Sequence, residues 1–431
     1  MISLFWVGRR GFDAGFVLVS AFILCQWTLT TSLSANLNKA CWVAKTKETF
    51  KLSDLQYLEA KLQERNGYEC ERLVVDASTG SSLFRLNGTC LHESMLENEL
   101  PSSLRRCEWV ASILAHGKTA EELLMNIRDD GKFMEHSWEK NAAWTLEYLR
   151  LNHIGAPRVQ PASYTSKSLS CSVAQAVRIP AALNPDEATD RFRIIDTGED
   201  LFLVRLMREA DPSHPLTKKW SQRPFPFSSA INPNVADILI DLVFDLVQQK
   251  DGVAVDPISF LDPTCGSGTF LAFAASRGAS VKGWDTNESC IDGALRNIKF
   301  VFGNDCAKFC EVHLRDASNK KLDDGKQYDC MIANLPWGQN TMLYYNENIH
   351  ILDSLQSSLR PGAPCAIISK DLELQKDMER LGYHILGTAH IPPLHFVLPT
   401  GKNKNAQKRN EETFHKERKS HCVVTVALAP Q

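Results

Sequence analysis

The stretch ISFLDPTCGSGTFLAFAASRGASVKGWD, residues 258–285, decides the fold of the second half of the chain. A short apolar run (258–261) reaches Asp-Pro, a Gly-x-Gly turn follows, and an apolar segment of helical length leads into a second strand-like run (280–285). A strand, a tight turn, a helix and a second strand in this order predict a βαβ unit with parallel strands. Gly266 and Gly268 remove side chains where the backbone has to turn sharply and approach a ligand closely.

The same alternation of strand-like and helix-like runs continues to the end of the chain. It predicts a parallel sheet with helices on both faces, so the predicted fold class is α/β with a doubly wound sheet. The last two apolar runs, YHILGTAHIP (383–392) and HCVVTVALA (421–429), have only a charged loop between them and are predicted to form an antiparallel pair at one edge. Ligands of such a sheet are expected at the carboxyl ends of its strands.

The first half of the chain, residues 36–207, has a different pattern. RFRIIDTGEDLFLVRLM (191–207) predicts a hairpin of two strands joined by a Thr-Gly-Glu-Asp turn, and Thr119 with Glu122 predicts a capping box at the start of a helix. This half is predicted to be α+β and shows no catalytic constellation. The proline-rich residues 208–227 are predicted to be a connector rather than a packed element.

The composition is that of an ordinary globular protein, with 431 residues, 44% hydrophobic and 23% charged, and a formal net charge of −3. The length suffices for two domains, and the net charge gives no bulk signal for a nucleic-acid partner. The 13 cysteines include no Cys-x-x-Cys pair. We therefore expect free thiols, no disulfide framework and no metal site.

Residues 1–35 are interpreted as a candidate targeting segment. Arg9 and Arg10 precede an apolar run, and a Ser/Thr stretch follows, with Asp13 as the only acid; this is the order found in signal and transit segments. The apolar run is too short and too interrupted for a transmembrane helix, so no membrane partner is predicted. We expect a cytoplasmic protein, with a mitochondrion or plastid as the alternative through residues 1–35.

Three consecutive predicted strands are each followed or ended by an aspartate: Asp262, Asp285 and Asp316. An acid at the end of the second strand can accept both hydroxyls of a ribose, and we expect the third acid within reach of the amino group of an adenine. The sequence lacks the lysine of a phosphate loop and the third glycine of a dinucleotide fingerprint. These residues therefore predict a site for a nucleoside without phosphates.

The stretch ANLPWG (333–338) ends the fourth predicted strand of the same sheet. The amide oxygen of Asn334 and a backbone carbonyl near Pro336 can accept both N–H bonds of a planar exocyclic amine and draw its lone pair out of the ring plane. Trp337 offers a face on which a flipped-out base can stack, and Pro336 stiffens the loop. The trio predicts a site where a base amine is held for reaction.

DPTCGSGTF followed by NLPWG resembles the S-adenosylmethionine-dependent amino methyltransferases, whose signatures are a DPxCGSGT loop and an (N/D)PP(Y/F/W) tetrad. The run WSQRPFPFSSAINPNVADILIDL (220–242) is similar to the RNA guanine-N2 methyltransferases, which often carry an N-terminal THUMP module. The resemblance covers residues 215–431. Over 36–207 it extends only to a ferredoxin-like and THUMP-like arrangement suggested by the hairpin and one helix.

The resemblance implies a Rossmann-like methyltransferase domain over 208–431, behind a THUMP-like RNA-binding region over 36–207. Its methyl donor would be S-adenosylmethionine. The residues implied to hold the donor are Asp262, Thr264, Cys265, Gly266, Gly268, Thr269, Asp285 and Asp316, with Cys265 interpreted as packing and not as a nucleophile; those implied to hold the target amine are Asn334, Leu335, Pro336 and Trp337. Leu335 stands where the family has its first tetrad proline, which leaves the rigidity of that loop in question.

The leading hypothesis is methylation of the N2 amine of guanosine in RNA, with tRNA the expected class and a small activator subunit as a candidate partner. Two alternatives stay open: adenine-N6 methylation of DNA or RNA, and a non-catalytic, cofactor-binding partner subunit. Two basic stretches offer candidate RNA contacts. Residues 402–419 hold seven Lys or Arg against three Glu, and residues 205–223 hold five Lys or Arg against one Glu and one Asp.

Overall fold

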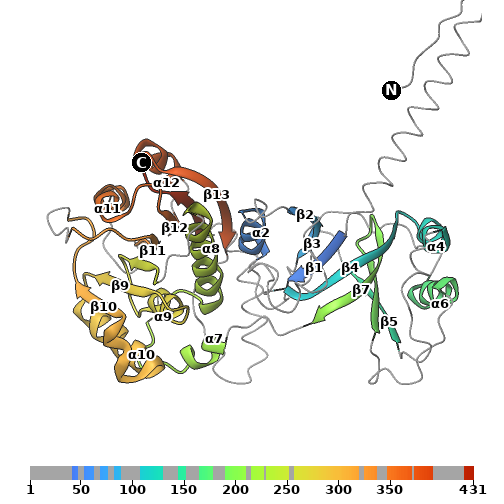
Figure 1. The fold of residues 1–431 in the computed structure, drawn as a ribbon, viewed down its shortest axis with the longest axis horizontal. Coiled ribbons are helices and arrows are strands. Elements are labelled where there is room, and N and C mark those ends of the chain that lie inside the picture. The colour runs from blue at the N-terminus through green and yellow to red at the C-terminus, as the bar shows by residue number, and fades with distance from the viewer. Residues whose placement is uncertain are drawn as a thin grey trace, which may run out of the picture.

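The protein contains two seven-stranded sheets, which lie side by side in the computed structural model (Figure 1). The structure describes residues 41–46, 53–62, 68–75, 82–88, 107–129, 144–151, 165–177, 190–209, 215–227, 230–251, 257–319, 325–336, 347–370, 373–391 and 422–431. All strands of the first sheet precede all strands of the second in the sequence. The domain boundary between residues 207 and 208 stays a prediction.

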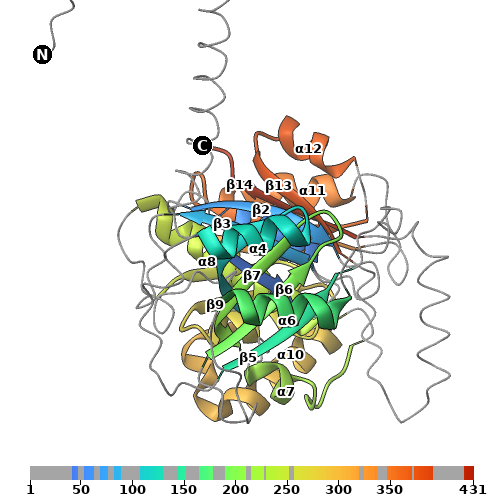
Figure 2. The same ribbon diagram turned by 90° about the vertical axis from the view of Figure 1, so that its right-hand side faces the viewer.

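The first sheet has the order β2-β3-β1-β4-β7-β6-β5, and its strands pair antiparallel except for the parallel pair β5–β6. Its strands are β1 (Cys41–Thr46), β2 (Tyr68–Val75), β3 (Ser82–Gly88), β4 (Cys107–Gly117), β5 (Trp144–Arg150), β6 (Asp190–Asp196) and β7 (Leu201–Glu209). Helices α4 (Ala120–Asp129) and α6 (Ser166–Val177) cover one face, as Figure 2 shows. The predicted α+β character of this half is confirmed.

Two local predictions in this half hold. The hairpin of β6 and β7 closes through a hydrogen bond from the backbone N–H of Thr197 to the carbonyl of Asp200 (3.0 Å). At the start of α4, the N–H of Glu122 donates to Thr119 Oγ1 (3.2 Å), and Glu122 Oε2 accepts from the N–H of Lys118 (2.8 Å). The first bond satisfies a backbone donor that the first helical turn leaves open, and the second joins Glu122 to the residue before the N-cap.

The second sheet has the order β10-β9-β8-β11-β12-β14-β13, and all its strands run parallel except β14. Its strands are β8 (Ser259–Asp262), β9 (Ser280–Asp285), β10 (Cys310–Leu314), β11 (Cys330–Asn334), β12 (Pro364–Ser369), β13 (His384–Ile391) and β14 (Cys422–Leu428). Strand order reverses between β8 and β11. In open α/β sheets, ligands bind at the carboxyl ends of the strands at this switch point.

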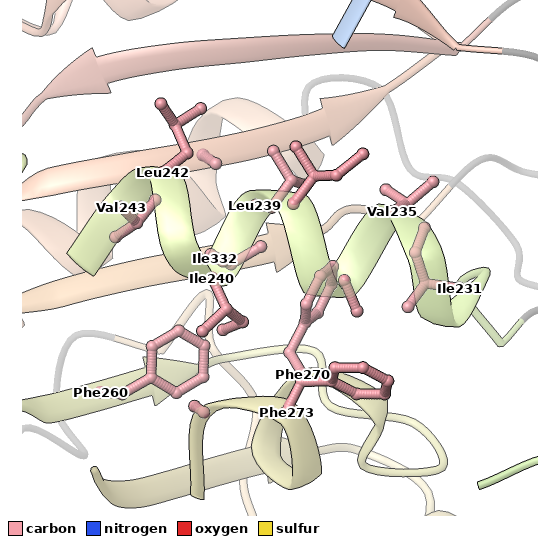
Figure 3. Close-up of a cluster of buried hydrophobic side chains, with 14 of the residues drawn as sticks. Ile231, Val235, Leu239, Ile240, Leu242, Val243, Phe260, Phe270, Phe273 and Ile332 are labelled. Atoms are coloured by element: carbon pink, nitrogen blue, oxygen red, sulfur yellow. The ribbon is translucent and has the colours of Figure 1, made fainter. Parts of the chain in front are cut away.

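Helices cover both faces of this sheet, which confirms the doubly wound α/β prediction. One face carries α8 (Pro233–Asp251), α9 (Thr269–Ala275) and α10 (Glu288–Phe302); the other carries α11 (Glu347–Leu355) and α12 (Leu374–Arg380). Figure 3 shows α8 with Leu239 and Ile240 in the cluster that contains Phe260 of β8 and Ile332 of β11. Each such fully buried side chain contributes roughly 1.5–3 kcal/mol of burial free energy.

Residues 208–227 differ from the prediction of an unpacked connector. They contain a short helix, α7 (Pro215–Trp220), and its Leu216 and Trp220 belong to the same buried cluster as α8. The indole of Trp220 is fully buried. The prolines mark the ends of this element and do not prevent its packing. The predicted antiparallel pair of β13 and β14 at one edge of the sheet is confirmed: β13 is the edge strand, and β14 lies between it and β12.

Helix α2 (Ser53–Leu62) belongs to the first half of the chain and packs against β13 at the edge of the second sheet (Figure 1). Its Leu55 and Leu58 are buried in the core cluster of the second sheet. Gly387 on β13 makes room for this contact, because a Cβ built there would lie 2.5 Å from Leu58 Cδ1.

The described cysteines are free thiols, most of them buried, as a reducing compartment would allow. Within the ranges given above, no helix is long and apolar enough to cross a membrane. The predicted targeting segment 1–35 lies outside the described residues.

Candidate active site

The loop between β8 and α9 is held in place by backbone hydrogen bonds to the end of β9. The N–H of Cys265 donates to the carbonyl of Trp284 (2.8 Å), and the N–H of Gly266 donates to Asp285 Oδ2 (2.9 Å). Gly266 and Gly268 have φ values of 50° and 82°, a region that favours glycine. The loop therefore lies directly beside the Asp285 carboxylate.

Two carboxyls face this loop, Asp262 buried and Asp285 half-buried. Asp262 is 1% exposed, and its Oδ1 accepts from the N–H of Thr264 (3.2 Å). Burial raises the pKa of Asp262 well above the usual carboxyl value, and the nearby charge of Asp285 raises it further. Burial also raises the pKa of Asp285, against the lowering effect of hydrogen bonds from Asn287 and Gly266. A positively charged ligand beside the two carboxyls would favour their ionised forms.

Cys265 and Thr269 are also buried in this loop. Burial raises the pKa of the Cys265 thiol well above its ordinary value, so the thiol stays protonated. A Cβ on Gly283 would lie 3.1 Å from Cys265 Sγ and 2.6 Å from Leu271 Cδ1, so this glycine lets the loop pack closely on β9. Thr269 begins α9, with its Oγ1 3.5 Å from Ser267 Oγ.

Asp316 follows β10 by two residues and starts a turn, so the strand ends earlier than predicted. Its Oδ1 accepts from the N–H (2.8 Å) and the Oγ (2.7 Å) of Ser318, a local pairing that stops the strand. The preceding residue ties β10 to β9 instead. The N–H of Arg315 donates to the carbonyl of Asp285 (2.9 Å), and its guanidinium lies 3.7 Å from the ring centroid of Trp284.

The loop after β11 begins with Asn334, whose Oδ1 is buried and has no hydrogen-bond partner in the described part of the chain. Thr264 Oγ1 donates to the backbone carbonyl of Asn334 (3.1 Å), which joins this loop to the β8–α9 loop. Leu335 is 1% exposed and its N–H donates to the carbonyl of Ile368 (3.0 Å). A proline could not make that bond. Burial and this hydrogen bond hold the backbone at Leu335 in place.

Some of the other predicted site and RNA-contact residues lie among the described residues, and some lie outside them. Pro336 is described and half-buried, whereas Trp337 and the basic stretch 402–419 lie outside the described residues. Two basic groups of the 205–223 stretch are occupied within the fold. Arg223 is buried, and Lys219 Nζ donates to a backbone carbonyl of α10 (2.6 Å), so this stretch offers fewer free charges to RNA than expected.

Sequence reasoning missed a residue that lies under the loop. Asn297 of α10 is fully buried; its Nδ2 donates to the carbonyls of Ser267 (3.0 Å) and Phe225 (2.9 Å), and its Oδ1 accepts from the N–H of Phe225 (2.8 Å). Phe227 was missed as well, although its ring would lie 3.6 Å from a Cβ built on Gly266. The Arg-Pro-Phe-Pro-Phe run at 223–227 was the sequence signal that could have indicated Phe227. No feature of the sequence around Asn297 indicated its role.

The arrangement suits a ligand with a positive charge and ribose hydroxyls. The buried carboxyl of Asp262, the half-buried carboxyl of Asp285 and a glycine turn lie at the switch point of the sheet. At the end of the neighbouring strand, the amide oxygen of Asn334 has no hydrogen-bond partner among the described residues. The described ranges contain no group of three His, Cys, Asp or Glu that could hold a metal ion. The residues present therefore fit a sulfonium nucleoside such as S-adenosylmethionine.

Comparison with known proteins agrees with this chemistry. Residues 222–382 match the family model described as "RMKL-like, methyltransferase domain". Over 193 residues the chain is 24% identical to a tRNA (guanine(10)-N2)-dimethyltransferase of Pyrococcus abyssi, covering 44% of this chain and 54% of that protein. It is also 24% identical over 133 residues to the Type II methyltransferase M.VspI of a Vibrio species, covering 26% of this chain and 32% of that protein.

The matched regions thus span about half, or less, of these curated relatives. Among solved structures, TrmN from Thermus thermophilus is similar with a TM-score of 0.44 at 18% identity, covering 90% of this chain and 99% of that one. Residues 222–382 therefore match a methyltransferase-domain model, and the methyl donor is S-adenosylmethionine.

Proposed function

We propose that this chain transfers a methyl group to the exocyclic N2 amine of a guanosine in RNA, with tRNA as the expected class. The observation that carries the proposal is the buried Oδ1 of Asn334 at the end of β11, which has no hydrogen-bond partner among the residues that the structure describes. An unsatisfied buried acceptor costs about 1–3 kcal/mol, so it calls for an explanation. The N–H of a base amine is a donor that would satisfy it.

The two loops of the site are held together, which supports a reaction between ligands bound to each. Thr264 follows the buried Asp262 in one loop and donates to the backbone of Asn334 in the other. S-adenosylmethionine, when bound, supplies an electrophilic methyl group on a positive sulfur. Each loop is held by backbone hydrogen bonds to a neighbouring strand, and one hydrogen bond joins the two loops. This arrangement orients the two ligands toward each other, and orientation of this kind provides much of the acceleration in transfer reactions.

Each residue of the target loop then has a distinct role. Asn334 accepts an N–H of the amine and favours the developing positive charge on its nitrogen. Leu335 anchors the loop through its bond to Ile368 and its buried side chain. Pro336 has a fixed φ and limits the conformations of Leu335 before it, and we assign Trp337 as the face on which the base stacks.

The relative from Pyrococcus abyssi supports guanine-N2 as the target and tRNA as the substrate. We assign the RNA-binding role to the THUMP-like region 36–207 and expect the protein in the cytoplasm, or in an organelle directed by residues 1–35. A second candidate is methylation of adenine N6 in DNA or RNA, because the Asn-x-Pro-aromatic sequence at residues 334–337 suits the amine of either base.

Mass analysis of nucleosides tests the proposal. RNA from cells that lack the protein is expected to lose N2-methylguanosine at one position, and the purified full chain, with an activator subunit added if needed, should restore it. Asn334→Ala should fail to restore it, whereas the exposed control Asn304→Ala should succeed. Unchanged N2-methylguanosine would refute the proposal, loss of N6-methyladenosine would favour the second candidate, and donor binding without transfer to any RNA would make the chain a non-catalytic subunit.

A further inference from the structure

The segment Arg223–Phe227, with sequence RPFPF, lies against the loop between β8 and α9 (residues 263–268), here called the donor loop. The ring of Phe225 fills a notch on α10, since a Cβ on Gly293 would lie 2.0 Å from Phe225 Cδ1. The rings of Phe225 and Phe227 stack with centroids 6.1 Å apart and an interplanar angle of 18°. Phe227 is only partly buried, and its ring is the group that a side chain on Gly266 would meet first. The first aromatic ring thus anchors the segment, and the second faces the glycine turn.

Asn297 fixes this segment and the donor loop to the same point of α10. Its amide makes two hydrogen bonds with the backbone of Phe225 and a third with the carbonyl of Ser267 in the donor loop. The side chain is fully buried, so loss of the amide would leave these backbone groups without partners away from water. One buried residue therefore sets the position of Phe227 relative to Gly266.

We propose that Phe227 forms an aromatic wall of the S-adenosylmethionine site and that Asn297 is the positioning residue that holds it there. The inference rests on the donor site proposed above. It adds to that site a segment that comes directly after α7 and before α8, outside the glycine loop and the three aspartates.

Chemistry supports an aromatic side chain at this place. In the donor loop, the N–H of Gly266 donates to Asp285, and the same loop faces the buried Asp262. Phe227 lies next to this loop, beside Gly266. An aromatic face attracts a cation, as the carboxyls do, and adds apolar contact area that the carboxyls lack. A sulfonium nucleoside has both a positive charge and apolar surface. The neutral thioether product has the apolar surface but lacks the charge.

Donor binding by the full chain tests the inference, measured by isothermal titration with S-adenosylmethionine and with S-adenosylhomocysteine. Phe227→Ala is expected to raise the Kd for S-adenosylmethionine about tenfold, and to raise the Kd for the neutral product less. The matched control Phe300→Ala removes an exposed phenylalanine on α10 and should leave both constants within twofold. An unchanged Kd for Phe227→Ala would overturn the inference.

A double variant separates positioning from a general structural role. Because Asn297 acts through Phe227, Asn297→Ala combined with Phe227→Ala should weaken binding about tenfold, no more than the stronger single variant. Multiplied effects of about a hundredfold would show that Asn297 acts independently and would refute its positioning role. Melting temperatures without ligand show whether each variant is folded at the assay temperature.

Asp285→Ala distinguishes failure of the inference from failure of the proposed function. If the unaltered chain binds no donor, the proposed function fails. If the unaltered chain binds and Asp285→Ala does not, while Phe227→Ala binds normally, only the aromatic wall is refuted.

Discussion

The contact between α2 and β13 can be tested by a pair of substitutions that compensate each other. Leu58 is 7% exposed, and its Cδ1 lies 2.5 Å from the place where a Cβ on Gly387 would be. Leu58→Ala removes buried carbons and is expected to lower the free energy of unfolding by about 2–3 kcal/mol. Gly387→Ala forces a methyl group into the Leu58 side chain and is expected to cost about 1–3 kcal/mol.

In the double variant, the new methyl group occupies space that the leucine side chain has left. The total cost should therefore fall short of the sum of the two single costs by about 1–2 kcal/mol. Urea unfolding of the full chain, followed by circular dichroism, measures all four proteins of the cycle. Additive costs would refute the packing of α2 against β13.

A second cycle serves as the control. Gly293 is equally intolerant of a side chain, because a Cβ there would collide with Phe225 on the far side of α10. Leu58→Ala and Gly293→Ala share no neighbour, so their costs should add within about 0.5 kcal/mol. Coupling in this cycle would mean that the compensation at Gly387 is not local.

Three further outcomes follow from the site and its surroundings. Asn334→Ala should abolish turnover and leave the donor Kd within about threefold, whereas Asp285→Ala should weaken donor binding about 10–100-fold through loss of a charged acceptor; equal loss of donor by both would contradict this division of roles. Burial raises the pKa of Asp262, so its contribution to the free energy of unfolding is greatest at acid pH and falls as pH rises from the ordinary carboxyl range through the raised pKa. Asp262→Asn should therefore raise the melting temperature of the ligand-free protein at pH 8 but not at pH 4, and a constant difference would contradict the assignment. Arg277→Met leaves the buried carboxylate of Asp237, now 2.5 Å from the guanidinium, without its charge partner; we expect a loss of about 3–5 kcal/mol in urea unfolding, and a loss below 1 kcal/mol would mean that the pair is solvated.

The sequence predicted those features that depend on neighbouring residues. The period of apolar residues gave the βαβ units, and the glycine turn placed Asp262 and Asp285 at adjacent strand ends. The extent of β10 was overestimated because Asp316 bonds locally to Ser318, and a turn of this kind competes with the strand.

Features that join distant parts of the chain could not be predicted in this way. Asn297 bonds to a segment 72 residues away, and its helix shows only an ordinary apolar stripe. Because Leu335 replaces the proline of the family's tetrad, the sequence left the rigidity of this loop in question. The loop backbone is held by a hydrogen bond from Leu335 to Ile368, which lies on another strand. Such contacts are set by tertiary structure, which local periodicity does not report.

The placement of β14 imposes an order on folding during synthesis. Among the described strands, β13 pairs only with β14, which pairs with β12 on its other side. The ribosome makes β14 after 30 further residues, so β13 has no partner in the sheet until then. Because α2 packs against β13, a helix of the first half of the chain reaches its final position only after this strand of the second half has been made. Ribosome-bound chains that stop before β14 would therefore expose the apolar surface of α2, and these are the species on which chaperones would be expected to act.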